Sequence, residues 1–267
     1  MRFQSLRNAG FWRVWQRNCP IIEFVLILAL DTSSPAGSIA VMRDDRVIGS
    51  VSAWTGEIYS SRMFSQLEFL LRELSLSIDD FDLFAVVVGP GSFTGLRVGL
   101  AAVKGWAEVY RKPIAAVSAL EAVAAQSHSD ASLLAPVLDA RRAQIYFAIY
   151  KRASASSFGG LTLENHESVA TPDEFLEALA SRINCSAMAI ITPVPELLSI
   201  AMSRCDTNHS SLRSTQIEQV SPVLAPHVAR LGALHARDGQ LVDSLTLDAN
   251  YIRRSDAELH WKAPAGS

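Results

Sequence analysis

Cysteine and metal-binding patterns are scarce in this sequence. Its 267 residues include three cysteines, Cys19, Cys185 and Cys205, and no two of them form a C-x-x-C pair. An odd number of widely spaced cysteines argues against a disulfide framework and favours a reducing, cytoplasmic setting. None of the six histidines has H-x-x-x-H or H-E-x-x-H spacing, so we expect no helical metal site of that type.

The sequence also lacks a surplus of basic residues. It has 24 Lys and Arg against 27 Asp and Glu, a net charge of -3 and a pI of about 6.1. Proteins that bind nucleic acid on their own normally carry a basic excess, although a local basic patch remains compatible with these totals. Hydrophobic residues make up 49% of the chain, which is enough to form one large core or two small ones.

The N-terminal segment has two interpretations. Residues 1–20 carry four arginines and no acid, and the apolar run 21–30 follows, as in a signal peptide. That run is too short to span a membrane, and Glu23 interrupts it. We instead predict that Phe24 to Leu30 forms a buried strand. Residues 1–24 are then a disordered extension or an artefact of a start site at Val25; a targeting segment or a docking helix is the alternative.

Hydrophobic periodicity predicts two similar halves. Expected strands are 24–30, 37–42, 46–54, 83–88, 114–117, 133–138, 144–150, 161–169 and 187–191. Expected helices are 59–74, 95–110, 119–126, 172–181 and 223–237, whereas 193–219 has little pattern. Two βββαβα units indicate a duplicated α/β fold. We predict an N-terminal subdomain over 25–117, a C-terminal subdomain over 118–221, and a C-terminal helical segment, about 222–254, that packs back on the first.

A glycine-rich segment follows the strand that ends at Val88. It comprises Gly89, Pro90, Gly91, Ser92, Phe93, Thr94, Gly95, Leu96, Arg97, Val98 and Gly99. It is neither a P-loop nor a G-x-G-x-x-G fingerprint. Free N–H groups at the start of a helix favour an anion site, whereas close packing of the helix on the sheet explains the glycines equally well. Both interpretations stay open at this point.

This segment resembles the signature of the bacterial TsaB (YeaZ-type) family, Gly-Pro-Gly-Ser-Phe-Thr-Gly-x-Arg-x-Gly. Four further segments are similar to the family and extend the resemblance from Ile27 to Arg253: Ile27–Ser33, Lys104–Gly105, Val137–Tyr146 and Asn250–Arg253. The resemblance implies a TsaD-related fold of the actin/Hsp70/sugar-kinase (ASKHA) type with two subdomains.

The resemblance implies a function as well. The chain would be a non-catalytic scaffold for TsaD, which transfers threonylcarbamoyl to the adenosine 3′ of the anticodon in ANN-decoding tRNAs. A TsaE-type ATPase is a further expected partner, and the chain would form a homodimer when alone. It would meet tRNA only through the complex, work in the cytoplasm without a membrane, and need no cofactor. Nucleotide at the TsaD interface stays open.

The resemblance also places the contact with TsaD, or with a second copy, on helices 59–74 and 95–110. The expected partner-binding residues are Met63, Phe64, Leu67, Leu70, Leu71, Gly95, Gly99 and Ala102. Glycine costs about 1 kcal/mol relative to alanine inside a helix, so the helical glycines suggest close approach by a neighbour. Packing on the chain's own sheet is the alternative.

Residues for catalysis are incomplete. The resemblance implies two phosphate hairpins of D-x-G type, at Asp31 and at Asp139. Because Asp139 lacks the glycine that lets a backbone approach phosphate, Asp31, Asp139 and Arg141 would form a vestigial cleft. Loop caps and a surface ion pair are the other interpretation of these three residues. A nucleotide-hydrolysing ASKHA enzyme is the first alternative function. A glycopeptidase-like hydrolase, with Ser92 or Thr94 as nucleophile, is the second.

Overall fold

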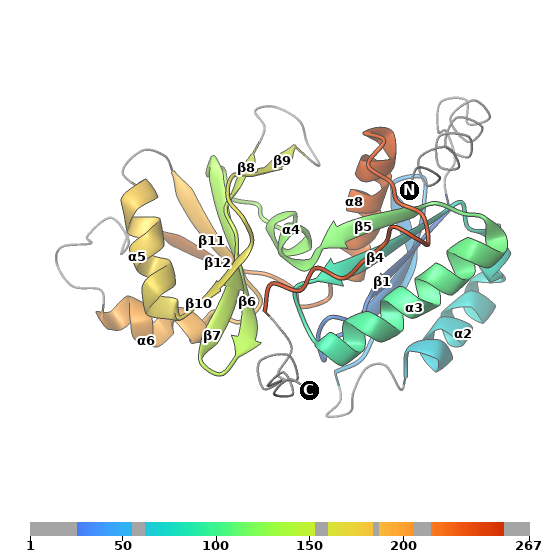
Figure 1. Ribbon diagram of the computed structural model, residues 1–267, viewed down its shortest axis with the longest axis horizontal. Helices are drawn as coiled ribbons and strands as arrows, with labels where there is room; N and C mark the ends of the chain where they lie inside the picture. The colour runs from blue at the N-terminus through green and yellow to red at the C-terminus, as the bar shows by residue number, and fades with distance from the viewer. Residues whose placement is uncertain (1–25, 55–61, 153–159, 184–186, 205–214, 254–267) are drawn as a thin grey trace, which may run out of the picture.

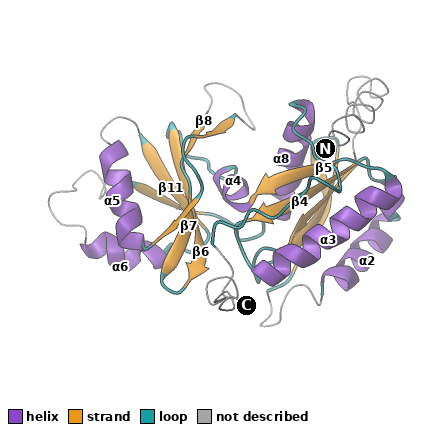
Figure 2. Ribbon diagram, in the orientation of Figure 1, coloured by secondary structure: helices purple, strands orange, loops and turns teal. Residues whose placement is uncertain are grey.

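The computed structural model of the protein describes residues 26–54, 62–152, 160–183, 187–204 and 215–253 (Figures 1 and 2). The predictions about residues 1–24 and about all three cysteines therefore lie outside the described residues. Two α/β lobes stand next to each other, with the strands of each lobe in one central layer (Figure 2). No helix in the described ranges is long and apolar enough to cross a bilayer.

The first lobe is built on a five-stranded sheet of order β3-β2-β1-β4-β5. Its strands are β1 (Leu26–Asp31), β2 (Ser38–Arg43), β3 (Arg46–Ser52), β4 (Leu83–Gly89) and β5 (Ile114–Ser118). The first three strands pair antiparallel, whereas β4 and β5 run parallel to β1. Three helical elements connect the strands: α2 (Met63–Leu74), the short 3-10 helix η2 (Ile78–Asp80) and α3 (Phe93–Tyr110).

The second lobe repeats this topology with the order β10-β7-β6-β11-β12. Its strands are β6 (Leu133–Arg141), β7 (Gln144–Phe147), β10 (Ser168–Ala170), β11 (Met188–Thr192) and β12 (Gln216–Gln219). Strands β8 (Tyr150–Arg152) and β9 (Leu161–Leu163) form an added hairpin beside β6. The helices are α5 (Pro172–Ile183) and α6 (Glu196–Arg204). The predicted duplicated fold is therefore confirmed.

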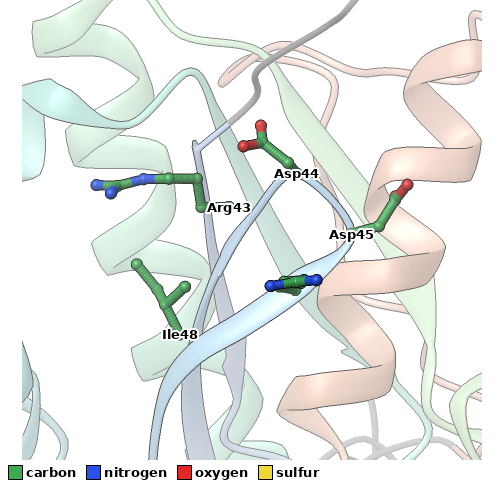
Figure 3. Close-up of a pocket in the computed structure, with 5 residues that line it drawn as sticks. Arg43, Asp44, Asp45 and Ile48 are labelled. Atoms are coloured by element: carbon green, nitrogen blue, oxygen red, sulfur yellow. The ribbon is translucent and has the colours of Figure 1, made fainter.

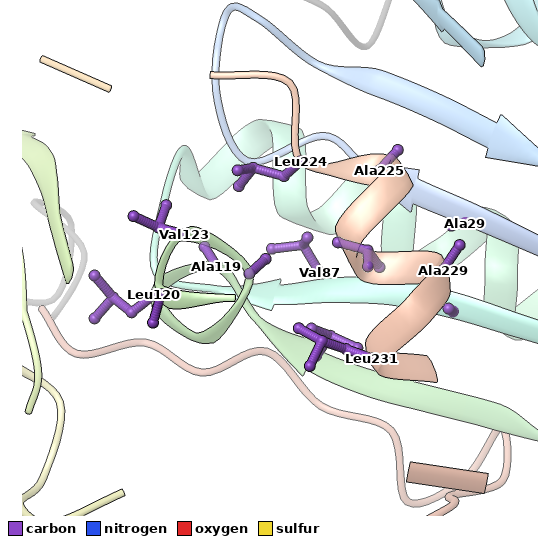
Figure 4. Close-up of a cluster of buried hydrophobic side chains, with 14 of the residues drawn as sticks. Ala29, Val87, Ala119, Leu120, Val123, Leu224, Ala225, Ala229 and Leu231 are labelled. Carbon is purple, nitrogen blue, oxygen red and sulfur yellow. The ribbon is translucent and has the colours of Figure 1, made fainter. Parts of the chain in front are cut away.

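The final helix of each repeat packs across the lobe boundary. Helix α4 (Ala119–Ala124) follows β5 of the first lobe and packs chiefly on β6 of the second. Helix α8 (Ala225–Arg237) follows β12 and packs on β1, β2, β4 and β5 of the first lobe. Figure 4 shows Leu120 and Val123 of α4 in the same buried cluster as Ala225 and Ala229 of α8. One hydrophobic core therefore extends through both lobes.

Strand β1 explains why the first apolar run has no alternation. Leu28 and Leu30 face the core under α2 and α3, whereas Ile27 and Ala29 face the core under α8. A strand covered on both faces needs apolar residues at every position, because successive side chains point to opposite sides of the sheet. The predicted buried strand is confirmed, and its described part begins at Leu26.

Several predicted boundaries differ from the structure. The weakly patterned region 193–219 contains α6 and β12, and the expected strand 161–169 is two short strands, β9 and β10. Asn165 separates these two strands and accepts a hydrogen bond from the Ile149 amide at 2.7 Å. The predicted capping box at α5 is confirmed, because the Thr171 amide donates to Glu174 Oε2 at 2.8 Å. Helix α3 starts at Phe93, two residues before the predicted start.

A half-buried ion pair joins α8 to α4, so the connection between these two helices can be tested by mutation. His235 Nε2 lies 3.1 Å from Glu121 Oε1. Burial lowers the pKa of His235, but the hydrogen bond and the charge of Glu121 outweigh it and leave the pKa above its usual value. The stabilisation is then fully present below the unfolded pKa of about 6.5 and is lost as the pH rises through the folded value.

We therefore expect His235→Gln to lower the free energy of unfolding by about 1–2 kcal/mol at pH 6 and by less at pH 8.5. Urea unfolding at the two pH values measures this difference. His166→Gln is the control, because His166 is exposed. An equal cost of His235→Gln at both pH values would show that the charged form of the histidine contributes nothing.

Candidate functional site at the glycine-rich loop

The glycine-rich loop leaves β4 at Gly89 and lies against the C-terminal segment. Gly89 has φ +133°, and the Gly89–Pro90 peptide bond is cis. A Cβ at Gly89 would lie 2.5 Å from the backbone oxygen of Asn250. The Asn250 amide donates to the carbonyl of Val88 at 2.7 Å. Glycine is therefore required at position 89 both for its φ and for the close approach of another backbone.

The other glycines of the signature pack against the end of β1. A Cβ at Gly95 would lie 2.0 Å from the Thr32 carbonyl oxygen, and one at Gly99 would lie 2.4 Å from Thr32 Oγ1. The Ser92 amide donates to the carbonyl of Ser33 at 2.7 Å, and Ser92 Oγ accepts from the Gly95 amide at 3.3 Å. The Ser92 and Gly95 amides are thus bonded within the chain. The close approach of Gly95 and Gly99 to Thr32 supports the packing interpretation of these glycines.

Asp31 is enclosed by this packing. Its side chain is fully buried, and Oδ1 accepts from the amide and the hydroxyl of Ser33 at 2.8 and 2.6 Å. Burial raises its pKa to about 6, although the two Ser33 hydrogen bonds act in the opposite direction. Within the described residues, Asp31 Oδ2 and Thr32 Oγ1 are buried without a hydrogen-bond partner. Asp31 therefore does not line an open cleft, which corrects that part of the vestigial-cleft prediction.

Asp139 and Arg141 lie at the turn between β6 and β7. Asp139 Oδ1 accepts from the Arg141 amide at 2.7 Å, and its Oδ2 lies 3.4 Å from Arg141 Nη1. The Arg141 side chain is 73% exposed. These two residues thus form the loop cap and surface ion pair of the alternative interpretation, and no hydrogen bond or ion pair among the described residues joins them to Asp31.

Most of the residues predicted to bind a partner belong to the chain's own core. Met63, Leu67 and Leu70 are 0 to 5% exposed and face the first sheet. Gly95 and Gly99 pack on Thr32, so their close neighbour is this chain and not another. Leu71 and Ala102 are half-buried against the same core. The partner-binding prediction is corrected for Met63, Leu67, Leu70, Gly95 and Gly99, and it stays a prediction for Leu71 and Ala102. Phe64 alone of the eight is exposed, at 57%.

The outer face of α2 and α3 carries other apolar side chains, which sequence analysis missed. Phe69 is 49% exposed, Val109 71% and Tyr110 37%. The sequence could have distinguished the buried from the exposed face of α2. Apolar residues at three- and four-residue spacing mark the buried face, and here they are Met63, Leu67, Leu70 and Leu74. The large apolar residues out of that phase are the ones that face solvent.

A cluster on the first turns of α3 unites the signature with the C-terminal segment. The Arg97 guanidinium lies 3.7 Å above the Phe93 ring, and Arg97 Nε donates to the Tyr251 hydroxyl at 3.3 Å. The rings of Phe93 and Tyr251 are 4.9 Å apart. The expected Tyr251–Arg253 element therefore meets the glycine-rich segment, although the two are more than 150 residues apart in sequence.

Glu167 is a second residue that sequence analysis did not find. Its carboxylate accepts from Ser118 Oγ of the first lobe, from the Tyr150 hydroxyl at 3.1 Å and from Asn250 Nδ2 at 2.6 Å. Burial raises the pKa of Glu167, and these three hydrogen bonds counteract part of the shift. Glu167 thus ties the second lobe to the first and to the C-terminal segment.

Neither the surface depression nor a search for metal-binding side chains indicates a second site among the described residues. A shallow depression over the β2–β3 turn is lined by Arg43, Asp44, Asp45, Arg46 and Ile48, whose side chains diverge (Figure 3). Asp45 pairs with Arg237 of α8 at 3.2 Å on the surface. Among the described residues, no group of three or more His, Cys, Asp or Glu side chains is placed to hold a metal ion.

Comparison with known proteins identifies the family. A family model described as TsaD, tRNA N6-adenosine threonylcarbamoyltransferase, matches residues 53–190, just over half of the 267-residue chain. The chain therefore belongs to the TsaD-related family, which includes TsaB and YeaZ-type proteins. The predicted resemblance is confirmed.

Individual relatives match part of the chain. It is 37% identical over 125 residues to the tRNA threonylcarbamoyladenosine biosynthesis protein TsaB of Bacillus subtilis, covering 47% of this chain and 55% of that protein. It is 31% identical over 149 residues to the TsaB of Escherichia coli, covering 55% and 63%. The chain thus spans less than two thirds of each of these relatives.

A solved structure shares the fold over a longer range. YeaZ from Pseudomonas aeruginosa superposes with a TM-score of 0.68 at 23% identity, over 85% of this chain and 99% of that one. At this level of identity the match shows the fold alone.

Two glycines of α3 give a matched test of the packing. Gly95→Ala places a Cβ against the Thr32 backbone, so we expect it to lower the free energy of unfolding by roughly 1–3 kcal/mol. Gly105 has no atom within 4 Å of an added Cβ, so Gly105→Ala should raise stability by up to about 1 kcal/mol. Denaturant unfolding compares the two. Equal effects would mean that the signature glycine is not packed as described.

Proposed function

We propose that the protein is the non-catalytic partner subunit of a TsaD-type protein in the biosynthesis of tRNA threonylcarbamoyladenosine. Membership of the TsaD-related family and similarity to two proteins named TsaB support this role. The reaction it would assist is threonylcarbamoyl transfer to the adenosine 3′ of the anticodon in ANN-decoding tRNAs. A TsaE-type ATPase would join the same complex, and the chain would pair with itself when the catalytic partner is absent.

One structural observation carries the partner role: the inner faces of α2 and α3 are filled by the chain itself, while their outer faces present large apolar side chains. Both helices cover the same face of the first sheet. Phe64 and Phe69 of α2 and Val109 of α3 remain between 49% and 71% exposed. Exposed aromatic and aliphatic groups on neighbouring elements are typical of protein interfaces, where aromatic residues contribute much of the binding energy.

The state of the two phosphate hairpins supports a non-catalytic role. Asp31 is fully buried, and Gly95 and Gly99 pack on the adjacent Thr32, so the structure leaves no open approach for a phosphate to the Asp31 carboxylate. In the second hairpin Asp139 bonds the Arg141 amide, which is a backbone donor that a phosphate would otherwise use. The arrangement thus offers no preformed cradle for nucleotide at either hairpin.

The interface prediction is tested by Phe64→Ser combined with Phe69→Ser. These exposed residues contribute little to the chain's own core, so the double variant should stay folded and bind the TsaD-type protein of the same genome at least about tenfold more weakly. Isothermal titration calorimetry measures the affinity. Ile200→Ser is the control, because Ile200 is 63% exposed on α6 of the other lobe. Unchanged affinity in the double variant would place the interface elsewhere.

The non-catalytic role is tested by tRNA modification. We expect the purified chain alone to form no threonylcarbamoyladenosine on an unmodified ANN-decoding tRNA transcript. Adding it to the TsaD-type and TsaE-type proteins should raise the yield above that of those two alone. Mass spectrometry of digested nucleosides measures the product. Modification by this chain alone would overturn the proposal.

A further inference from the structure

Four arginines and two aromatic rings gather where the two lobes meet. We call this set the arginine strip, and it consists of Phe93, Arg97, Arg141, Arg142, Tyr251 and Arg253. The residues come from α3, from the β6–β7 turn and from the C-terminal segment, which Figure 1 shows crossing the first lobe towards β6. The three elements are neighbours, because the C-terminal segment contacts α3 through Tyr251 and the end of β6 through Arg253.

Arg97 is held in a fixed orientation. Its guanidinium stacks 3.7 Å above the Phe93 ring while its Nε donates to Tyr251, and the residue remains exposed. Arginine stacked on an aromatic ring keeps other N–H groups in one plane, a geometry that suits phosphate oxygens. Tyr251 itself is 41% exposed and offers ring surface beside this guanidinium.

The C-terminal segment carries the strip from the first lobe to the second. Arg253 Nη1 donates to the Ala140 carbonyl at 3.4 Å, next to Arg141 and Arg142. Both of these arginines are exposed at the β6–β7 turn, where they have φ of +62° and +55°. Asp139 balances part of the Arg141 charge at 3.4 Å.

Anchors on both sides of the segment fix its position. Asn250 is bonded to the Val88 carbonyl of β4 at 2.7 Å and to Glu167 of the second lobe at 2.6 Å. The strip is therefore a built surface, because its middle part cannot shift without breaking contacts to both lobes. Preorganised donors lose less entropy on binding a ligand.

We propose that the arginine strip binds the phosphate backbone of the tRNA substrate directly, with Tyr251 available to stack on an unpaired base. This inference rests on the proposed function for the identity of the RNA. An extended polyanion fits the observations because the arginines come from three segments and two lobes, and because Arg97, Arg141 and Arg142 are exposed. Stacking of aromatic or arginine side chains on unpaired bases together with arginine–phosphate contacts is the usual mode of single-stranded RNA recognition.

The test compares Arg97→Gln, Arg141→Gln and the double variant with wild type. The control is Arg43→Gln with Arg204→Gln, which removes the same charge from two exposed arginines away from the strip. Arg43 pairs with Leu26, at the end of the first sheet opposite Asp31, and Arg204 ends α6. A dye-labelled, unmodified ANN-decoding tRNA transcript is titrated with each protein, alone and in complex with the TsaD-type partner. Fluorescence anisotropy measures the affinity at KCl concentrations from roughly 50 to 200 mM. Binding through phosphate contacts weakens steeply over this range.

We expect the double variant to bind the tRNA on the order of tenfold more weakly, with a salt slope reduced by about one for each arginine removed. The control variant should bind as wild type does. Circular dichroism and co-elution with the partner confirm that each variant is folded and assembled. The proposal would be overturned if the double variant bound the tRNA as tightly as wild type does. It would also be overturned if millimolar ATP displaced all of the bound tRNA, because the strip would then be a site for a single nucleotide.

The assembly measurement separates this inference from the proposed function. If wild type and variants all co-elute with the TsaD-type protein but bind tRNA with the same affinity, the proposed role of the arginine strip is wrong and the partner role stands. If wild type does not co-elute, the partner role fails, and the titration of the chain alone decides the strip. No tRNA binding by either preparation also counts against it.

Discussion

The structure depends on one close contact, the packing of α3 on the end of β1. Gly95 lies so near the Thr32 carbonyl that a Cβ would approach it to 2.0 Å, and Gly99 meets the Thr32 side chain in the same way. Because these two positions are one helical turn apart, they fix both the height and the rotation of α3 above the sheet. That rotation turns Leu100 and Val103 towards the core and leaves Arg97 and Val109 facing out. The exposed surfaces of the first lobe therefore follow from the glycine spacing.

The same contact connects the two lobes indirectly. The loop that it holds accepts the C-terminal segment at Gly89, and Asn250 of that segment reaches Glu167 in the second lobe. The exchanged helices α4 and α8 supply the apolar part of the connection, because their side chains belong to one buried cluster. A two-lobed protein with a continuous core and a polar anchor resists independent movement of the lobes. Surfaces that combine residues of both lobes are consequently well defined.

Sequence patterns predicted the parts of the fold whose burial is complete. Strands β1 and β4 are covered on both faces and so appear as unbroken apolar runs. Strand β12 escaped prediction because Ile217 is its one apolar residue. Strands β9 and β10 were predicted as one strand, because each has only three residues and no clear turn signal stands between them. At the candidate site, the glycine-rich segment was found from the sequence. The partner contact was placed on the wrong face of α2 and α3, because apolar residues at helical spacing mark the face that packs in the core. Glu167 had no local signal, because its partners Ser118, Tyr150 and Asn250 are set by the tertiary fold alone.

The complete burial of Asp31 is a costly feature of the first lobe. A carboxylate that is fully buried, with a pKa raised to about 6 and one oxygen without a hydrogen bond among the described residues, is costly to retain. Ser33 offsets part of this cost, because its amide and hydroxyl satisfy the other oxygen, and α3, which packs on the adjacent Thr32, also completes the core. The Asp31 carboxylate is therefore enclosed within the first lobe. What remains for recognition is the outside: the outer face of α2 and α3, and the arginine strip where the lobes meet.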